Sequence, residues 1–212
     1  MNSIVQNFEN IKSLIANSNV KIIAVSKTFS YEHIKPLIDY GHNHFGENKV
    51  QEAQMKWQEI RKKNSHIKLH MIGKLQSNKV KEAVNFFDFI HSVDSLKLAG
   101  LLSRYEQSLN RKLSYFIQVN IGNETQKSGI PIKSLDEFYY HCINKLKLNV
   151  IGLMAIPPND GKESLHFKNL MEMNKLVGLK EISMGMSGDF KEAIKYEATY
   201  VRIGSSIFGN RS

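Results

Sequence analysis

Short apolar runs alternate with longer segments of helical period along this chain, and the alternation restricts the fold to the parallel α/β class. The first apolar run covers residues 20–25, and residues 31–40 follow it with helical spacing. Parallel strands need a crossover connection, which is usually a helix, so each run and the helix after it form one strand–helix unit.

The pattern recurs until the end of the chain. The predicted strands are residues 20–25, 42–45, 67–72, 87–91, 115–120, 150–155, 181–184 and 200–203. The predicted helices are residues 31–40, 48–62, 77–85, 95–109, 134–146, 163–176 and 189–196, with an extra helix before the first strand. Eight such units predict a single (β/α)₈ TIM barrel.

The length of 212 residues lies near the lower end for that fold, which covers roughly 200 to 400 residues. We therefore expect lean loops and one domain over residues 1–212. An open, doubly wound sheet is the alternative, but it needs a glycine-rich turn after the first strand. Ser26-Lys27-Thr28-Phe29 supplies no such turn.

The formal charge of +9 raises the question of a polyanionic partner, but the 29 basic residues are scattered. The densest cluster, Arg61-Lys62-Lys63, is expected at a solvated helix end, so we predict no specific nucleic-acid binding. No apolar stretch approaches the roughly 20 residues of a membrane span. The lone Cys142 is predicted to be structural, and a cytoplasmic location is expected.

Lys27 stands at the carboxyl end of the first predicted strand. In a TIM barrel this is the functional face, and a lysine amine there can form an imine with a carbonyl compound. Taken alone, a lysine at a strand end is more often a surface residue, so its interpretation depends on the loops around it.

Two glycine and serine loops follow the last two predicted strands, where barrels of this type commonly bind phosphate. Gly185-Met186-Ser187-Gly188 leads into Asp189 and Glu192, which have the spacing of a helix start. Gly204-Ser205-Ser206 follows the eighth strand, and Ser205 adds a hydroxyl. Either loop alone could be an ordinary turn. Together they predict a phosphate cradle, and with an imine-forming lysine they point to pyridoxal 5′-phosphate (PLP).

Arg202 alternates with the apolar Val201 and Ile203, so its side chain is expected to enter the barrel mouth. Arginine has no acceptor atom, and beside the pyridine nitrogen of PLP it would keep that nitrogen unprotonated. An unprotonated ring is a weaker electron sink, which disfavours transamination.

The chain resembles the pyridoxal phosphate homeostasis family, small PLP-binding proteins similar to the barrel domain of alanine racemase. The motifs that carry the resemblance run over nearly the whole sequence. They are Ala24-Val25-Ser26-Lys27, His44-Phe45-Gly46-Glu47-Asn48, Ile72-Gly73-Lys74-Leu75-Gln76-Ser77-Asn78-Lys79, Lys127-Ser128-Gly129, Gly152-Leu153-Met154, Ser183 to Ser187, and Val201-Arg202-Ile203-Gly204 with Phe208-Gly209.

The resemblance implies that Lys27 forms the Schiff base and that Arg202 faces the pyridine nitrogen. It also implies a cofactor site completed by further residues near the phosphate and the ring, namely Ser187, Gly204, Ser205 and Asn48. From its position Asn48 could equally cap the helix that follows. Gln76, Asn78 and Lys79 could likewise be loop and capping residues or lie at the cofactor mouth.

Two positions depart from the usual family pattern. Ser205 stands where threonine is common and keeps the hydroxyl. Glu197 stands where glycine usually separates the last helix from the last strand. A side chain in a left-handed helix stop costs about 1 kcal/mol, so this change bears on stability rather than on binding.

The resemblance implies a non-catalytic, monomeric protein that stores, delivers or buffers PLP, with PLP-dependent apoenzymes as candidate partners. A PLP racemase needs acid/base groups on both faces of the substrate carbon. Alanine racemase takes the second from a partner's additional domain, for which we see no counterpart here. A PLP-dependent racemase or related enzyme, with one of the eight tyrosines as second base, is the alternative.

Histidines and methionines outside these motifs are predicted to be structural. His66 and His70 have i, i+4 spacing, but on a strand they would share a face without a cysteine or carboxylate to complete a metal site. No metal is therefore expected. Met154 and Met186 fall at strand ends and are interpreted as core residues.

Overall fold

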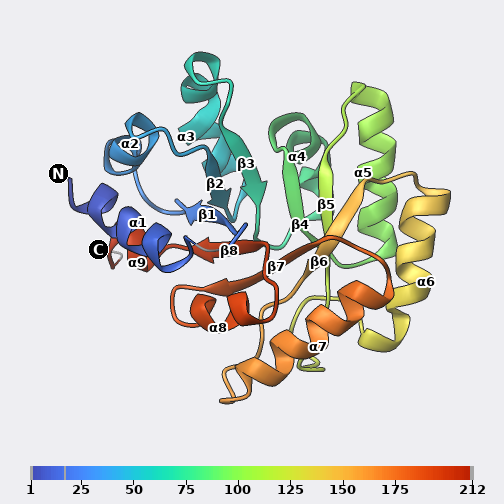
Figure 1. The fold of residues 1–212 in the computed structure, drawn as a ribbon. Helices are drawn as coiled ribbons and strands as arrows, with labels where there is room; N and C mark the ends of the chain where they lie inside the picture. Colours follow the sequence, from blue (N-terminus) through green and yellow to red (C-terminus); the bar gives the residue numbers. More distant parts are fainter. Residues whose placement is uncertain (1, 17, 211–212) are drawn as a thin grey trace.

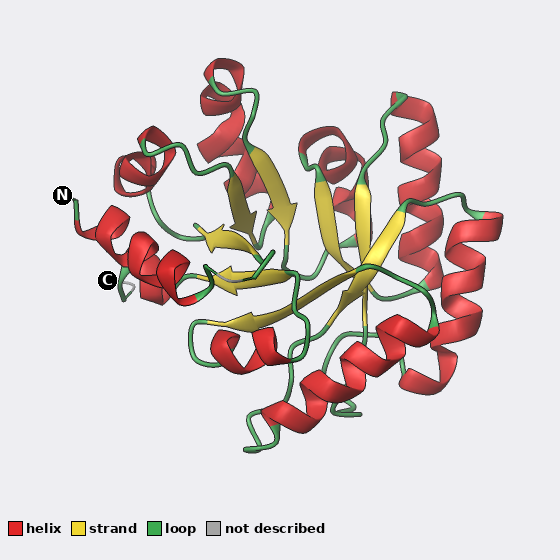
Figure 2. Cartoon of the chain, in the orientation of Figure 1, coloured by secondary structure: helices red, strands yellow, loops and turns green. Residues whose placement is uncertain are grey.

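The computed structural model of the chain describes residues 2–16 and 18–210 and has a closed parallel barrel at its centre (Figure 1). The strands lie in the middle and the helices lie around them, as colouring by secondary structure shows (Figure 2). Each strand pairs with its neighbour in sequence, and β8 closes the barrel against β1. The predicted (β/α)₈ barrel is confirmed.

The strands are β1 (Lys21–Val25), β2 (His44–Glu47), β3 (Lys68–Met71), β4 (Phe89–Val93), β5 (Ser114–Gln118), β6 (Val150–Met154), β7 (Glu181–Met186) and β8 (Tyr200–Ile203). The α-helices are α1 (Ser3–Leu14), α2 (Tyr31–Asp39), α3 (Val50–Lys63), α4 (Val80–Phe86), α5 (Leu96–Leu109), α6 (Leu135–Tyr140), α7 (Glu163–Leu176), α8 (Phe190–Lys195) and α9 (Ser205–Phe208). Short 3₁₀ turns η1 (Ser77–Lys79) and η2 (Ile132–Ser134) precede α4 and α6, and the π-helical turn η3 (His141–Lys145) extends α6.

Side chains alternate between two cores because successive residues of a strand point to opposite faces. The larger core lies between strands and helices and includes Phe45, Trp57 and Val201. A smaller core fills the barrel, where Ile23, Phe116, Met154 and Tyr200 pack together. Cys142 is fully buried in the outer core, as its structural interpretation requires.

Several element boundaries differ from the predictions. β2 was predicted over residues 42–45 but begins and ends two residues later, because buried Gly46 and Glu47 belong to it. A Cβ on Gly46 would lie 2.8 Å from Ile23 Cγ2, so the glycine leaves room for the inner core. β4 shifts in the same direction, β7 extends to Met186, and the helix predicted over residues 134–146 becomes π-helical after Tyr140.

The predicted extra N-terminal helix is present as α1, and it packs on the end of the barrel where the chain finishes. Asn2 caps α1 by accepting a hydrogen bond from the Ile4 amide, and Phe8 and Ile11 are buried. The Asn7 side chain donates to the Ile207 carbonyl at 3.1 Å, which ties α1 to α9. Figure 1 accordingly shows α1 beside α9. The helix thus supports the segment that begins with Ser205.

No helix in the described ranges is long and apolar enough to cross a membrane.

The predicted left-handed stop after the eighth helix is confirmed, because Glu197 has a φ of +63°. We expect Glu197→Gly to raise the free energy of unfolding by about 0.5–1 kcal/mol, since glycine adopts this conformation without Cβ strain. The exposed Glu197–Lys175 ion pair, at 2.5 Å, offsets little of this gain.

Urea unfolding of the two proteins measures the difference. Glu197→Ala is the matched control, because it removes the same ion pair but keeps the strain. Equal stability of the glycine and alanine variants would contradict the explanation.

Candidate active site

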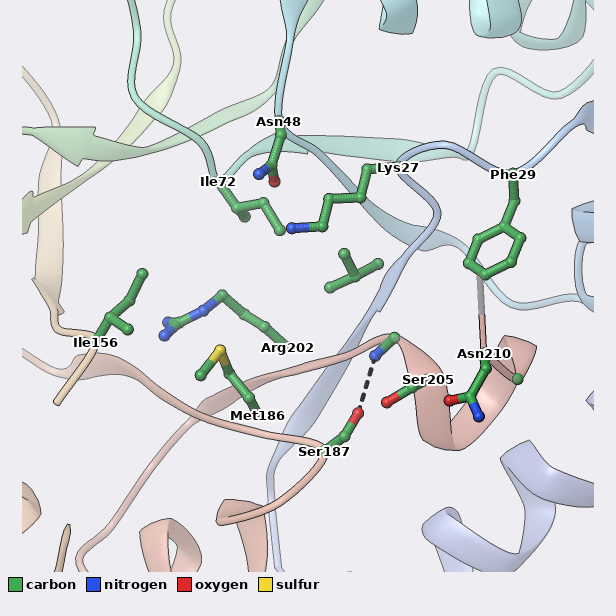
Figure 3. A pocket seen from close by; sticks show the side chains of 13 residues that line it. Lys27, Phe29, Asn48, Ile72, Ile156, Met186, Ser187, Arg202, Ser205 and Asn210 are labelled. Carbon is green, nitrogen blue, oxygen red and sulfur yellow. Dashed lines mark hydrogen bonds between the residues drawn. The ribbon is translucent and has the colours of Figure 1, made fainter. Parts of the chain in front are cut away.

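A cavity of about 530 Å³ lies at the carboxyl ends of the first, second and last strands. Figure 3 shows the side chains of Lys27, Asn48 and Arg202 directed into it. Its lining unites segments from both ends of the sequence: Val25, Lys27, Phe29, Asn48, Ile72, Ile156, Met186, Ser187, Arg202, Gly204, Ser205, Gly209 and Asn210. All six residues predicted for the site line this one cavity.

Lys27 stands in a tight turn directly after β1. The Phe29 amide donates to the Ser26 carbonyl at 3.2 Å, and Thr28 has a φ of +70°. A β-branched residue in the left-handed region is strained, so the surrounding structure must hold this turn. The turn brings the half-buried Lys27 side chain back over the barrel mouth.

A buried ionic cluster behind the turn supplies that support. Glu47, at the end of β2, is fully buried, and its Oε1 accepts hydrogen bonds from Ser26 Oγ at 2.7 Å and Lys56 Nζ at 2.9 Å. Trp57 Nε1 donates to the same oxygen at 2.9 Å. Lys56 Nζ also donates to the Ser26 carbonyl at 2.6 Å. Ser26, the residue before Lys27, is therefore fixed from two sides.

Asn48 lines the cavity and does not cap the helix that follows. Lys49 occupies the N-cap position of α3, which begins at Val50, so the capping interpretation of Asn48 is wrong. Gly73, in the loop after β3, approaches the Asn48 backbone closely: a Cβ on Gly73 would lie 2.4 Å from the Asn48 carbonyl oxygen. This close approach accounts for a glycine at position 73.

A second cavity of about 300 Å³ adjoins the first and shares Asn48 with it. Gln76 and Lys79 line this second cavity, whereas Asn78 is exposed on η1. Of the three polar residues predicted near the mouth, none lines the main cavity.

The loops after β7 and β8 meet at the Ser187 hydroxyl. The backbone amides of Gly204 and Ser206 both donate to Ser187 Oγ, at 3.3 and 3.4 Å, and Figure 3 marks the first of these bonds. Two N–H groups that converge on one oxygen form an anion-binding concavity. Ser205 lines the cavity beside them and begins α9.

Asp189 occupies the N-cap position of α8, where a helix start was predicted, but its side chain does not cap the helix. Asp189 Oδ1 accepts a hydrogen bond from the Met186 amide at 2.5 Å, and no side-chain bond caps α8. The carboxylate therefore closes the Met186–Asp189 turn and leaves the start of α8 without a side-chain cap.

Arg202 enters the barrel from β8, as predicted, and only 4% of its surface is exposed. Its Nη1 donates to the Ser183 carbonyl at 2.8 Å and to Ser183 Oγ at 2.7 Å, while Nη2 donates to the Ala155 carbonyl at 2.9 Å. Burial lowers the pKa of Arg202 to about 10, and the Asp189 charge acts in the opposite direction. The guanidinium stays charged at neutral pH and faces the cavity.

Three histidines form a row inside the barrel that ends at Ser183. His44 Nδ1 lies 2.8 Å from His70 Nε2, His70 Nδ1 lies 2.9 Å from His91 Nε2, and His91 Nδ1 lies 3.0 Å from Ser183 Oγ. His70 was expected to be a structural residue, but the row itself was not predicted, because its members come from three different strands. His66 lies in an exposed turn before β3 and not on a shared strand face.

Several cavity residues were not predicted as site residues. Met186 is 40% exposed and lines the cavity, so its interpretation as a core residue is wrong, whereas Met154 is fully buried. Phe29, Ile156 and Asn210 come from loops and the chain end, where no periodicity marks a direction. Position at a strand's carboxyl end was the one signal that could have identified Ile72 and Met186.

Within the described ranges, no group of three or more His, Cys, Asp or Glu side chains is arranged to hold a metal ion. The histidine nitrogens contact one another instead.

The buried cluster behind Lys27 generates a stability prediction. We expect Lys56→Met to lower the free energy of unfolding by about 3 kcal/mol or more, because it leaves the buried Glu47 carboxylate without its cation. Chemical denaturation measures the loss. Lys62→Met, which breaks the exposed Lys62–Glu59 pair on the same helix, is the matched control and should cost less than about 1 kcal/mol. Similar losses in the two variants would contradict the role of Lys56 as the partner of the buried Glu47 carboxylate.

The histidine row predicts acid-sensitive stability. Burial holds the pKa of His91 well below its usual value, and the Arg202 charge lowers it further; burial and then His91 do the same for His70. The unfolded chain therefore binds more protons than the native state below about pH 6.5. Stability should fall as the pH falls, by about 2 kcal/mol per histidine between pH 7 and pH 5.

Urea unfolding of the wild type and of His91→Gln across this pH range checks the assignment. Besides His70, the groups that face His91 are Ser183, Arg202, Phe116 and Tyr200, and none of them titrates between pH 5 and pH 7. The variant should lose stability less steeply with falling pH. An unchanged slope would show that His91 does not contribute.

Comparison with known proteins shows which family this chain belongs to. Residues 1–212 match the family model described as the alanine racemase N-terminal domain. The chain is 37% identical to the pyridoxal phosphate homeostasis protein of Vibrio alginolyticus, over 100% of this chain and 99% of that protein. It is 34% identical to that of Escherichia coli strain K12, over 100% and 98%.

Solved structures agree with this placement. PipY of Synechococcus elongatus, solved with PLP bound, superposes with a TM-score of 0.89 at 32% identity, covering 97% of this chain and 100% of PipY. Alanine racemase of Clostridium difficile gives a TM-score of 0.78 at 16% identity over 57% of its length, which is a likeness of fold alone. The chain therefore belongs to the pyridoxal phosphate homeostasis family, whose barrel is the one also found at the N-terminus of alanine racemase.

Proposed function

We propose that this protein binds PLP as a Schiff base on Lys27 and serves PLP homeostasis by storing, delivering or buffering the cofactor, with little or no catalysis. The proposal includes a monomeric, cytoplasmic protein that exchanges PLP with PLP-dependent apoenzymes. Family membership and the PLP-bound neighbour PipY support it.

One observation carries the proposal: a single cavity brings together an amine, a guanidinium and a pair of converging backbone amides. The Lys27 amine would attack the aldehyde carbon of PLP, form the imine and release water. The Gly204 and Ser206 amides, with Ser187 and Ser205, suit the phosphate. Arg202 suits the pyridine nitrogen as a donor that accepts no proton.

The cavity has the size and chemistry that a small phosphorylated ring requires. Its volume of about 530 Å³ falls in the range typical of small-molecule sites. Two cationic side chains, Lys27 and Arg202, favour an anionic ligand, while Ile72, Ile156 and Met186 provide apolar walls for a ring. Asn48 stands beside Lys27 in this view of the site (Figure 3), which supports a place for it near the ring.

The lining also supports a non-catalytic role. Among the described residues of the cavity wall there is no tyrosine, histidine, cysteine or carboxylate beside Lys27. Racemisation needs a second acid/base group on the opposite face of the substrate carbon. The racemase alternative would have to recruit such a group from outside this wall.

Titration of the protein with PLP, followed by absorption spectroscopy, tests the covalent link. We expect the wild type to develop a visible band that borohydride reduction removes, and Lys27→Ala to lack that band because it lacks the amine. Lys74→Ala is the matched control: Lys74 is an exposed lysine of the neighbouring cavity, and its loss should leave the band intact.

A wild type without the band, or a band that persists in Lys27→Ala, would overturn the proposed binding mode. The PLP-loaded wild type should also fail to racemise L-alanine in steady turnover. Turnover at ordinary enzyme rates, about 1 per second or faster, would favour the racemase alternative.

A further inference from the structure

We infer that His44, His70, His91 and Ser183 form one hydrogen-bond chain with a fixed direction, that Arg202 sets this direction, and that the chain positions the Arg202 guanidinium at the floor of the cavity. The hydrogen-bond chain and its direction follow from this structure alone. Its effect on PLP rests on the proposed function.

The direction follows from the bonding capacity of Arg202 and Ser183. A guanidinium has donors and no acceptor, so Arg202 Nη1 must donate to Ser183 Oγ. Among the residues that the structure describes, the other neighbour of this hydroxyl within hydrogen-bond distance is His91 Nδ1. The Ser183 hydroxyl hydrogen can therefore be satisfied only by donating to His91 Nδ1. The reverse arrangement would leave that hydrogen buried without an acceptor, at a cost of about 1–3 kcal/mol.

The choice at His91 propagates along the row. If His91 Nδ1 accepts, the ring of a neutral His91 carries its hydrogen on Nε2 and donates it to His70 Nδ1. His70 then carries its hydrogen on Nε2 and donates to His44 Nδ1. All three rings should thus be neutral with the hydrogen on Nε2, and the chain runs from Arg202 toward His44.

Stacked aromatic rings hold the row in this geometry. His70 stacks on Phe89, with ring centroids 4.2 Å apart and planes inclined by 9°, and His91 stacks on Phe116 at 4.2 Å and 18°. Tyr200 packs edge-on against His91 from β8. The rings cannot turn without disrupting the inner core, so the hydrogen bonds are fixed along with the packing.

The chain gives a buried cation a neutral partner. No ion pair of Arg202 occurs within residues 2–16 and 18–210; its hydrogen bonds go to two carbonyls and one hydroxyl. A hydroxyl that donates is a stronger acceptor, because hydrogen bonds in a chain polarise one another. The row thereby strengthens the Ser183–Arg202 bond without a carboxylate bonded to the guanidinium, and the Asp189 charge acts on Arg202 without a hydrogen bond to it. Arg202 is held in position and keeps its charge for the ligand.

The ring-nitrogen ¹⁵N chemical shifts of histidine-labelled protein test the direction, because they distinguish protonated from bare nitrogens. In the PLP-free protein at neutral pH, we expect His44, His70 and His91 each to carry a hydrogen on Nε2 and none on Nδ1. A hydrogen on Nδ1 of His70 or His91, or a charged ring in either, would overturn the inference.

Substitution of Ser183 tests the positioning role. We expect Ser183→Ala to shift the signals of His91, His70 and His44 and to weaken PLP binding about tenfold, the loss typical of one hydrogen bond to a charged group. Ser92→Ala is the matched control. Ser92 is the next residue after His91, is 1% exposed, and has no hydrogen-bond partner for its hydroxyl in the described structure. This variant should leave both readouts unchanged.

The histidine ¹⁵N shifts test the hydrogen-bond chain, and the PLP affinity tests its effect on the ligand, so the two measurements separate this inference from the proposed function. A wild type that binds no PLP but shows the expected nitrogens would contradict the proposed function and leave the directed chain standing. Unchanged PLP affinity and an unchanged spectrum of bound PLP in Ser183→Ala would overturn the positioning role. Equal effects in Ser183→Ala and Ser92→Ala would overturn it as well, since they would indicate a general loss of packing.

Discussion

The burial of the Arg202 guanidinium inside the barrel is the constraint around which the rest of this site is arranged. A buried cation is costly unless every donor finds an acceptor, and here the acceptors come from β7 and from the residue after β6. Ser183 therefore has to point inward, and its hydroxyl needs an acceptor in turn. The histidine row supplies the acceptor for the Ser183 hydroxyl. One buried charge near the cavity is therefore linked by hydrogen bonds to a polar residue as far away as β2.

Barrel closure turns this arrangement into a binding site. Arg202 on β8 is paired with Ile23 on β1, which places Lys27 close to the last two loops although they are far apart in sequence. The Lys27 turn and the Ser187 loop are each held by their own local bonds, through Glu47 in one case and Asp189 in the other. The cavity is thus assembled from separately fixed pieces, which suits a site formed before its ligand arrives.

The fold and the six residues that share the cavity could be predicted because they lie in short stretches of sequence with a recognisable pattern or family motif. Periodicity marked the strands, and the position at the end of the first strand marked Lys27. The glycine and serine loop after the seventh strand marked Ser187, and alternation with Val201 and Ile203 marked Arg202. The failures have a common physical cause. The end of β2 was predicted too early because Glu47 is charged, and charged residues are usually exposed. Its burial depends on the partners Lys56 and Trp57, which lie on the next helix. The role of His70 depends on its contacts with His44 and His91 on the neighbouring strands, which a local pattern in the sequence does not show.

A polar row inside a barrel limits what the molecule can be. Branched apolar residues usually fill this space, and replacing them with histidines sacrifices apolar packing and adds sensitivity to acid. The exchange is useful only if the cation at the end of the row must stay charged and in place. Burying an arginine paired with a carboxylate would cost less free energy than burying an unpaired arginine, but the charge would be largely neutralised. The architecture thus favours a ligand whose acceptor atom takes a hydrogen bond from a full positive charge, as an unprotonated ring nitrogen does. Such a ring is held firmly yet remains a weak electron sink, which disfavours transamination.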